Sequence, residues 1–530
     1  VWRAHPAEAA AALPGTLPDL PGARARPRAA APEEWTVAET LEMLRTGDAS
    51  AVEVMEAHLA LVRAWDDIYQ AFNHIDPDAA LARAREIDSG RRRGPLAGVP
   101  LAMKDNYFTA GIPTTANSWV FDDFVPEFDA EAWARLQAAG AVLVGKTQMG
   151  PLATTRATTP DGTATTVNAW DPRPGGASPG GSSSGSATAV AGRLVAGATG
   201  TQTGGSITNP SDAQGLTGLK PTMGRVSLRG IIPLTYTRDH PGPLARDAID
   251  AAILLQTMAG PDPADPRTLG LPEVPDLVVA ATPVEAGGRV RLRWPTTIGV
   301  PPGWLDEPEA PEPLAADADE ATRARHARRM EFVARSRAEL GPRSAFLDAM
   351  RAAGAEVREV ELPEDWDTLT GGAFNNVRLP ERSEPFIEAL RHDVRDFGVS
   401  LGSWIHGLLL PATEYLKGQR ARELLLRRVL FDLFAQCDVV VQTSPIPFDI
   451  IGLPLITFPV GFTEGEAGPL PSGVMLGGHP FAEDRLLSIA AAWQATTDHH
   501  RRRPPLPDRG FATRGTPERL DVQDAVDTSQ

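Results

Sequence analysis

The chain has 530 residues, 42% of them hydrophobic, and can therefore bury a large core. Its formal net charge of −17 disfavours a broad phosphate-binding surface, and with it a nucleic-acid partner. The single cysteine, Cys437, excludes an internal disulfide and a cysteine-based metal cluster, and no apolar run reaches the roughly 18 residues of a membrane span. These bounds predict a soluble protein and leave its compartment open, cytoplasmic or exported after N-terminal processing.

The first predicted helices follow a lead-in of residues 1–33, which is rich in Ala, Pro and Arg and is expected to be extended or disordered. Thr36 and Glu39 fit a capping box, and apolar residues then recur on one helical face until Gly47. A second capping pattern begins at Ser50. We interpret both segments as scaffold helices.

A lysine ends the first predicted buried strand, within residues 96–106 (LAGVPLAMKDN). Val99, Leu101 and Met103 alternate onto one face, and Lys104 follows at the far end. Most lysines lie in water, so from this stretch alone a solvated cation is the better interpretation. A lysine enclosed by apolar neighbours would instead have a lowered pKa and could act as a base near neutral pH.

Residues 140–147 (GAVLVGKT) match the phosphate-loop pattern GxxxxGK[ST] letter by letter. A phosphate loop needs its strand before the first glycine and flexible residues between the glycines. Here a predicted helix, residues 131–139, precedes the motif, and a predicted strand, residues 141–144, fills its middle. The match therefore does not indicate nucleotide binding, and Lys146 is expected to be structural or solvent-facing.

Half of the residues from Gly175 to Ser206 are glycine or serine. An apolar stretch, residues 187–198, lies between two Gly/Ser-rich turns, which predicts a loop, a short helix and a second loop. Each loop carries a serine after paired glycines, Ser182 and Ser206. Glycines let backbone N–H groups approach a ligand, and a serine hydroxyl can attack an acyl carbon. The pattern therefore favours acyl transfer.

The same segment contains GxSxG at residues 181–185, which would make Ser183 the nucleophile of an α/β-hydrolase elbow. That elbow requires a strand directly upstream. Prolines at positions 172, 174 and 179 disfavour a central strand there. The elbow is therefore the weaker of the two interpretations.

The remaining chain is less informative. Residues 215–234 predict brief strands, and residues 247–259 predict a helix. The acidic, Pro-rich residues 307–319 are expected to be a surface loop rather than a metal site, because they lack histidine and patterned spacing. Two further helices are expected over residues 321–340 and 344–353. Aromatic residues between 365 and 415 fit either substrate-side helices or core packing.

The two glycine-rich loops, GGSSSGSA and GTQTGGSITNPSDAQGLTGLKPT, together resemble the signature of the amidase signature family of serine hydrolases. The resemblance implies a triad in which Lys104 relays a proton through Ser182, held on a cis peptide bond, to the nucleophile Ser206. It implies an oxyanion hole formed by backbone N–H groups of the run Thr203, Gly204, Gly205 and Ser206. The residues expected to support these loops are Gly181, Ser183 and Gln202.

This chain departs from the family pattern beside the nucleophile. Where the family usually has GTDTGGSIR, it has GTQTGGSIT, so that Gln202 replaces an acid and Thr208 replaces an arginine. We interpret this as the exchange of a charge pair for neutral groups, which leaves the nucleophile intact and changes the surroundings of the loop. None of the ten histidines belongs to the matched segments, which disfavours a serine, histidine and acid triad.

The fold implied by the resemblance is α/β, a large twisted mixed sheet with helices on both sides. One catalytic domain is expected over residues 34–503, with a variable helical substrate region at about 280–435 and a C-terminal tail at 504–530. The resemblance is strongest over residues 96–260 and weakest over residues 280–435.

The activity implied is that of an amidase, which hydrolyses the non-peptide C–N bond of a small or medium acyl amide through an acyl-enzyme. An anilide or a carbamate (urethane) requires the same carbonyl attack. One alternative is the glutaminase-type amidase subunit of a tRNA-dependent amidotransferase, and another is a catalytically silent binding scaffold. The expected partner is a small-molecule amide. No metal or organic cofactor is expected, and a homodimer, frequent in the family, is one candidate assembly.

Overall fold

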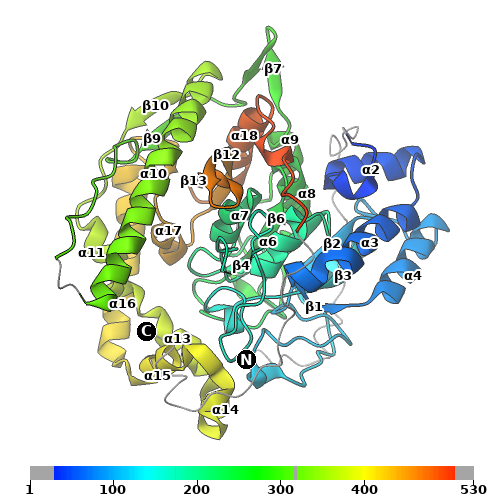
Figure 1. Ribbon diagram of the computed structural model, residues 1–530, viewed down its shortest axis with the longest axis horizontal. Coiled ribbons are helices and arrows are strands. Elements are labelled where there is room, and N and C mark those ends of the chain that lie inside the picture. The colour runs from blue at the N-terminus through cyan, green and yellow to red at the C-terminus, as the bar shows by residue number, and fades with distance from the viewer. Residues whose placement is uncertain (1–28, 174, 316–318, 508–530) are drawn as a thin grey trace.

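The computed structural model describes residues 29–173, 175–315 and 319–507. Within them a mixed sheet of 11 strands runs through the protein in the order β1-β3-β2-β4-β6-β5-β12-β13-β11-β9-β10 (Figure 1). The strands are β1 (Phe72–Ile75), β2 (Pro100–Lys104), β3 (Val142–Thr147), β4 (Gly197–Gln202), β5 (Thr217–Lys220), β6 (His240–Ala245), β9 (Thr297–Val300), β10 (Glu356–Glu359), β11 (Val439–Val441), β12 (Leu455–Gly465) and β13 (Gly468–Gly478). A separate hairpin pairs β7 (Val284–Ala286) with β8 (Arg289–Arg291).

Parallel and antiparallel pairs occur in the same sheet. β2 runs parallel to both β3 and β4, and β9 runs parallel to β10 and β11. The strands between these groups, from β4 through β6, β5, β12 and β13 to β11, pair antiparallel. The predicted α/β fold with a large mixed sheet is confirmed.

Helices cover both faces of this sheet. In β2, Leu101 and Met103 belong to one apolar core and Ala102 to another, as period-two alternation requires. The first core contains residues of α2 (Val37–Thr46), α5 (Glu131–Ala138), α8 (Ala248–Met258), α9 (Leu277–Ala280) and α18 (Glu483–Gln494). The second contains residues of α3 (Ala51–Tyr69), α4 (Pro77–Asp88) and α6 (Ser184–Ala191).

The N-terminal scaffold helices form as their caps predict. Thr36 and Glu39 form a complete capping box at α2, and Ser50 and Glu53 form another at α3. Gly47 ends α2 with φ 74°, a left-handed conformation that favours glycine. Most of the predicted lead-in, residues 1–28, and most of the predicted tail, residues 508–530, lie outside the described residues.

The helical region opposite the N-terminal half consists mainly of short helices (Figure 1). We use this name for α11 (Trp366–Thr370), α12 (Gly372–Asn375), α13 (Arg378–Ser383), α14 (Ile387–His392), α15 (Leu401–Leu409) and α16 (Ala412–Arg428) with the 3₁₀ and π turns η5 (Glu384–Phe386), η6 (Val394–Ser400) and η7 (Val429–Leu433). Phe386, Phe397 and Trp404 are buried against one another, and Phe386 also meets Phe121 at a centroid distance of 6.1 Å. These aromatic residues therefore serve core packing.

Two sequence-based expectations are wrong. The helices expected over residues 321–340 and 344–353 form one helix, α10 (Glu320–Ala352), with Pro342 inside it. A proline removes one backbone hydrogen bond, but Phe346, Leu347 and Met350 beyond it are buried in the core, which keeps the last turns in place. The apolar stretch 187–198 is not one helix, because its end begins the buried strand β4.

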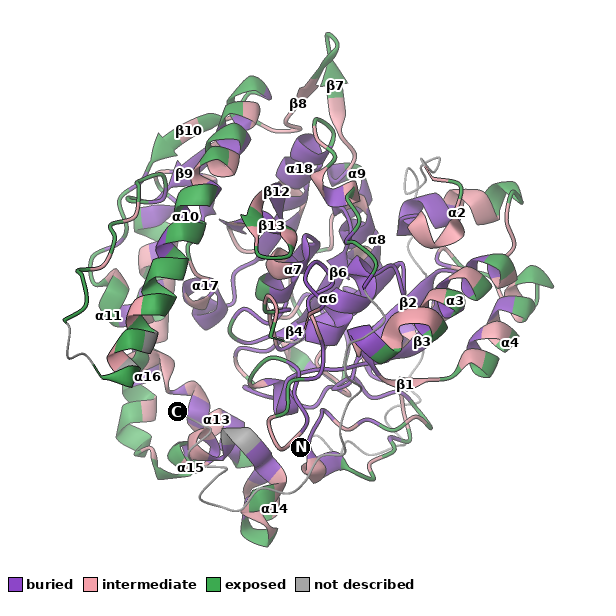
Figure 2. Ribbon diagram, in the orientation of Figure 1, coloured by how far each residue is buried: buried purple, intermediate pink, exposed green. Residues whose placement is uncertain are grey.

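The remaining helices are α7 (Thr208–Gln214) and α17 (Ile446–Ile451), and the short 3₁₀ segments are η1 (Pro32–Glu34), η2 (Trp119–Phe121), η3 (Pro151–Ala153), η4 (Pro266–Thr268) and η8 (His499–Arg501). All residues of α6 are buried, whereas much of α10 faces solvent (Figure 2). Among the described helices, none combines the length and apolar character needed to cross a membrane.

Candidate active site

Lys104, the predicted base, is the last residue of β2 and is fully buried. Its strand lies between β3 and β4, so the side chain emerges inside the sheet rather than at an edge. The Nζ atom lies 2.8 Å from Oγ of Ser182, 2.9 Å from Oγ1 of Thr201 and 3.3 Å from the Thr201 carbonyl oxygen. Burial lowers the pKa of Lys104 to about 7, and the Asp239 carboxylate acts in the opposite direction. The alternative of a solvated strand-end cation is wrong.

Ser182 lies in the turn that leads into α6, and its peptide bond to Gly181 is cis. The side chain is buried, and the main-chain carbonyl oxygen accepts the Gly150 N–H at 3.0 Å. A Cβ added at Gly181 would lie 2.5 Å from Cα of Arg156, so the close approach of these two segments requires glycine. The two predicted residues Lys104 and Ser182 are thus in direct contact.

Ser183, the serine of the alternative elbow, is the residue before α6 and is fully buried. Its carbonyl oxygen accepts the Ala187 N–H at 3.1 Å, which starts the helix. Its hydroxyl has no hydrogen-bond partner among the described residues. The hydroxyl packs closely against Gly200, because a Cβ added there would lie 2.8 Å from Oγ. As far as the structure describes the preceding segment, 171–180, it contains no strand, so the elbow geometry does not form.

Ser206 lies on the loop between β4 and α7 and is 8% exposed. The Gly205 N–H donates to Oδ2 of Asp449 at 2.8 Å, and Gly205 has φ 91°, which favours glycine. The N–H groups of Gly204 and Ser206 have no hydrogen-bond partner in the part of the chain described. Of the predicted oxyanion donors, Gly205 is therefore already engaged with a carboxylate.

Two residues without any sequence motif hold Thr203, the first residue of this loop. Nη2 of Arg238 donates to the Thr203 carbonyl oxygen at 2.9 Å, and the Thr203 hydroxyl donates to Oδ1 of Asp239 at 2.5 Å. The other oxygen of Asp239 accepts the N–H groups of Leu234 and Thr235 at 2.8 and 3.0 Å. Burial raises the pKa of Asp239 to about 6. Because 36 residues separate Asp239 from Thr203, no local pattern predicts this contact.

The two glycine-rich loops lie against each other. A Cβ added at Gly180 would lie 2.5 Å from Cα of Pro210, in the first turn of α7. Among the hydrogen bonds of the described residues, none joins Ser206 to Ser182. The structure therefore brings Lys104 and Ser182 together and places Ser206 on the neighbouring loop.

Gln202 fixes the nucleophile loop through its amide. Its Oε1 accepts the N–H groups of Ile207 and Thr208, both at 2.9 Å, and its Nε2 donates to Asp449 at 2.9 and 3.2 Å. Asp449, on α17, also lies 3.6 Å from Nζ of Lys220. The ion pair beneath the loop is therefore formed by Lys220 and Asp449, while the side chains of Gln202 and Thr208 are neutral. Sequence analysis missed Asp449 because 247 residues separate it from Gln202.

Lys146 has a structural role. It lies within β3, is fully buried, forms an ion pair with Asp105 at 3.1 Å and donates to Oγ1 of Thr114 at 2.7 Å. The residues that match the phosphate-loop pattern form this strand rather than a loop. They therefore present no cradle of backbone N–H groups to a phosphate.

A cavity of about 920 Å³ lies between the loops at 228–239 and 264–267 and the helical region, and Asp239 is part of its wall. Ile231, also in the wall, pairs through its main chain with Tyr107, three residues after Lys104. The lining residues come from the loops around 228–239 and 264–267 and from α13, η5, Leu410 and the start of α16. Its volume is typical of a site for a small molecule. Asp239 connects the cavity wall to the loop that carries Ser206, and Ile231 connects it to the segment that follows Lys104.

Comparison with known proteins gives one consistent result. The model of the family described as Amidase matches residues 53–296. One of the subunits of the glutamyl-tRNA(Gln) amidotransferase of Chloroflexus aurantiacus is 34% identical, over 89% of this chain and 98% of the relative. A protein named amidase from Pseudomonas putida is 34% identical over the same shares.

Solved structures agree with the sequence relatives. The native peptide amidase of Stenotrophomonas maltophilia superposes with a TM-score of 0.71 at 29% identity, covering 89% of this chain and 99% of that one. The corresponding glutamyl-tRNA(Gln) amidotransferase chain of Thermotoga maritima gives a TM-score of 0.66 at 23% identity, covering 91% of this chain and 99% of that one, and shows similarity of fold.

Proposed function

This chain belongs to the amidase signature family, and we propose that it is a stand-alone amidase in which Ser206 attacks the carbonyl carbon of a small or medium acyl amide. The observation that carries the proposal is the contact of a buried lysine with a lowered pKa, Lys104, with Ser182, on a loop packed against that of Ser206. Family membership supports amide chemistry, and this geometry supports the proton path.

A neutral amine fits the surroundings of Lys104. Such a group has two hydrogens and one lone pair, and Nζ has three contacts. The two hydrogens can point to the hydroxyl and carbonyl oxygens of Thr201, which leaves the lone pair for the Ser182 hydroxyl proton. Lys104 then acts as the base, and Ser182 acts as both acceptor and donor.

The proposed reaction moves protons along one line. Ser206 Oγ bonds to the carbonyl carbon as its proton passes to Ser182 Oγ, and the Ser182 proton passes to Lys104 Nζ. The carbonyl oxygen, now negative, takes hydrogen bonds from the N–H groups of Gly204 and Ser206. The protons return along the same path to the departing nitrogen, and water then hydrolyses the acyl-enzyme.

The Gly205 N–H has a different role in this proposal. Its bond to Asp449 fixes the peptide plane between Gly204 and Gly205, and the Gln202 amide fixes the start of α7. An N–H donor that is already oriented before the reaction needs little free energy of reorganisation during it. Asp449 and Gln202 therefore position the loop rather than touch the substrate.

A test measures release of amine or ammonia by the purified chain from a primary amide, an anilide and an aryl carbamate. We expect turnover of at least one of them, and Ser206→Ala should lower it by about 10⁴-fold or more, as for other serine nucleophiles. Ser89→Ala, at the exposed end of α4, is the matched control and should retain activity. Equal activity of Ser206→Ala and the wild-type protein would remove Ser206 as the nucleophile.

The second candidate is a glutaminase subunit of a tRNA-dependent amidotransferase. It is favoured by the 34% identity to the Chloroflexus aurantiacus amidotransferase chain over 98% of that protein. In this case the isolated chain should hydrolyse none of the three substrates, and it should release ammonia from glutamine when partner subunits are added. Serine-dependent turnover by the isolated chain would exclude this requirement.

A further inference from the structure

The walls of the 920 Å³ cavity combine apolar surface with an excess of carboxylates. The apolar part includes Leu228, Ile231, Leu410 and several prolines. The charged lining residues are two arginines and four acids, which leaves a formal charge of −2: Arg229, Arg267, Asp239, Asp265, Glu381 and Glu384. A concave, low-dielectric site with an excess of one sign attracts the opposite charge.

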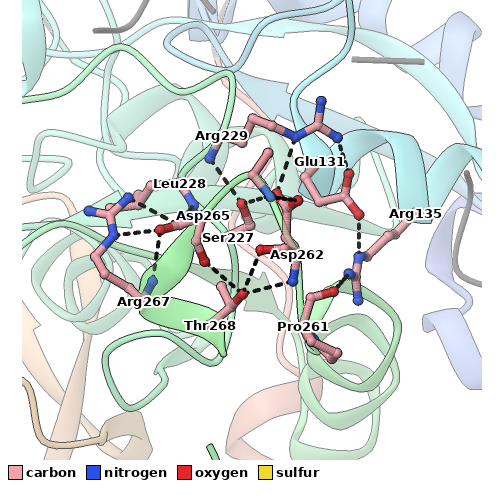
Figure 3. A network of polar contacts seen from close by, with 11 residues as sticks. Glu131, Arg135, Ser227, Leu228, Arg229, Pro261, Asp262, Asp265, Arg267 and Thr268 are labelled. Carbon is pink, nitrogen blue, oxygen red and sulfur yellow. Dashed lines mark hydrogen bonds and ion pairs between the residues drawn. The ribbon is translucent and has the colours of Figure 1, made fainter. Parts of the chain in front are cut away.

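Both lining arginines are already neutralised. Arg229 forms ion pairs with Glu131 and with Asp262, the latter at 3.1 Å (Figure 3). Arg267 forms an ion pair with Asp265 at 2.7 Å and lies over the ring of Tyr236 at 4.0 Å (Figure 3 shows the pair). Neither guanidinium is therefore positioned to receive an anionic substrate, and Asp265 is not free to receive a cation.

Glu381 is held in place by uncharged donors. It accepts the N–H and hydroxyl of Thr237 at 2.9 and 3.0 Å, the Tyr415 hydroxyl at 2.9 Å and the Gln419 amide at 3.1 Å. Three of these bonds go to Oε1 and only one to Oε2, which leaves Oε2 with acceptor capacity. On the side away from the 920 Å³ cavity, Arg422 lies near Glu381, and its positive charge partly offsets the charge of that carboxylate.

Among the four acids of the cavity wall, Glu384 has the fewest described partners. It is exposed, and its side chain forms no ion pair within the described part of the chain. Its position three residues after Glu381, across the junction of α13 and η5, places both acids on one side of the helical turn. The ring of Tyr415 lines the same wall. Two carboxylates and an aromatic ring are the groups that bind an organic ammonium in proteins.

We propose that this cavity selects amides whose non-reacting end is an apolar chain or ring that carries a primary ammonium or guanidinium group. The apolar body contacts Leu228, Ile231 and Leu410, and the cation lies between Glu384, Oε2 of Glu381 and the Tyr415 ring. This assignment rests on the proposed function, because it takes Ser206 as the reacting centre. It names the class of substrate that the cavity chemistry favours.

The experiment compares two matched substrate pairs that differ in one charge. In the first, 6-aminohexanoyl p-nitroanilide is compared with heptanoyl p-nitroanilide. In the second, the ammonium is on the amine side, as in N-acetyl-1,6-diaminohexane compared with N-acetylheptylamine. We expect kcat/KM to favour the ammonium member of at least one pair by about 10-fold, the range of a partly desolvated charge contact. The preference should fall as ionic strength rises.

Variants assign the preference to the cavity wall. Glu384→Gln and Glu381→Gln should each reduce the preference toward one, mainly through KM for the ammonium member, with the neutral member little changed. Glu388→Gln removes a carboxylate of the same segment that is 88% exposed and paired with Arg391, and it should leave the preference intact. The proposal would be overturned if kcat/KM were equal for the two members of both pairs. It would also be overturned if neither Glu384→Gln nor Glu381→Gln reduced the preference for the ammonium member.

A binding measurement separates this proposal from the proposed function. The dissociation constants of the same compounds are measured by calorimetry on Ser206→Ala, which does not need turnover. Tighter binding of the ammonium members, lost in Ser206→Ala with Glu384→Gln, supports the cavity assignment even if the wild-type protein hydrolyses nothing, a result that would defeat the proposed function alone. Equal dissociation constants would overturn the cavity assignment.

Discussion

The glycine-rich loops around Ser182 and Ser206 and the helical region are built in different ways. Ser182 and Ser206 are buried, and the close approaches of their loops require glycine at positions such as Gly181. The helical region is made of short helices that expose large apolar side chains such as Leu409 and Leu416. In the proposed function, the reaction chemistry therefore depends on local backbone geometry, whereas substrate selection depends on tertiary placement.

Few polar contacts join the two regions. Arg238 donates to Oδ1 of Asn375 at 2.5 Å, and the Thr237 N–H donates to Glu381 at 2.9 Å. Both contacts start from the loop that also carries Asp239, which holds Thr203. Residues 237–239 are thus one described segment that connects the helical region to the loop that carries Ser206.

The largest expected effect is on the catalytic side. Lys104→Ala removes the base, and kcat should fall by about 10³-fold or more, within the usual range of general acid–base catalysis. The measurement is kcat on the best substrate of the panel, with neither salt nor divalent metal restoring it. Lys417→Ala, a 61% exposed lysine on α16, should leave kcat unchanged. A change in KM alone would contradict the proton path.

The ion pair beneath the loop should matter for stability. Asp449→Asn leaves Lys220 fully buried without its carboxylate, and breaking a buried pair costs about 3–5 kcal/mol of the free energy of unfolding. Chemical denaturation measures this change. Glu414→Gln, in an exposed pair with Lys417, should cost about 0.5 kcal/mol or less. Equal costs in both variants would show that the pair is not a support of the loop.

A variant of the helical region should separate packing from chemistry. Phe386→Ala removes the centre of the aromatic cluster with Phe397 and Trp404 and should cost about 3 kcal/mol, mostly as local unfolding. Limited proteolysis should then cut within residues 366–433, and KM should rise more than kcat falls. If kcat fell as far as in Lys104→Ala, the two regions would not be separable.

The smallest expected effect is a shift in pH dependence. Turnover needs neutral Lys104, whose pKa is lowered to about 7, so kcat/KM should rise with pH through that value. The Asp239 carboxylate favours the charged amine, and its removal should therefore lower the pKa of Lys104 further. Asp239→Asn keeps the shape of the side chain and one oxygen to accept the N–H groups of Leu234 and Thr235, and its NH2 can donate to the Thr203 hydroxyl oxygen. The acid limb of this variant should lie at lower pH than that of the wild-type protein.

Asp498→Asn, a surface variant with a 69% exposed carboxylate, is the control for this shift. An acid limb in Asp239→Asn that stays in place or moves to higher pH would contradict the electrostatic link between Asp239 and Lys104.

The sequence predicts the catalytic side better than the helical side for a physical reason. Paired glycines allow turns that other residues avoid, so Ser182 and Ser206 could be proposed as candidates from neighbouring residues, and capping boxes at Thr36 and Ser50 mark helix starts in the same local way. The mixed sheet followed from the family resemblance.

The contacts that the sequence did not predict all join distant segments. Asp449 reaches Gly205 across 244 residues, and Glu381 reaches Thr237 across 144. Pro342 was compatible with a helix end, and only burial of the turns after it keeps α10 continuous. Such outcomes depend on packing, which no local pattern encodes.

Covalent labelling of the wild-type protein with a serine-directed probe, phenylmethanesulfonyl fluoride, followed by peptide mass mapping, tests whether Ser206 is the nucleophile. We predict one adduct, on Ser206, formed faster as pH rises through about 7, in keeping with the lowered pKa of Lys104. The labelling rate should fall strongly in Lys104→Ala. An adduct on Ser182 or Ser183 with Ser206 unmodified, in a protein that has lost its activity, would contradict the assignment of Ser206 as the nucleophile.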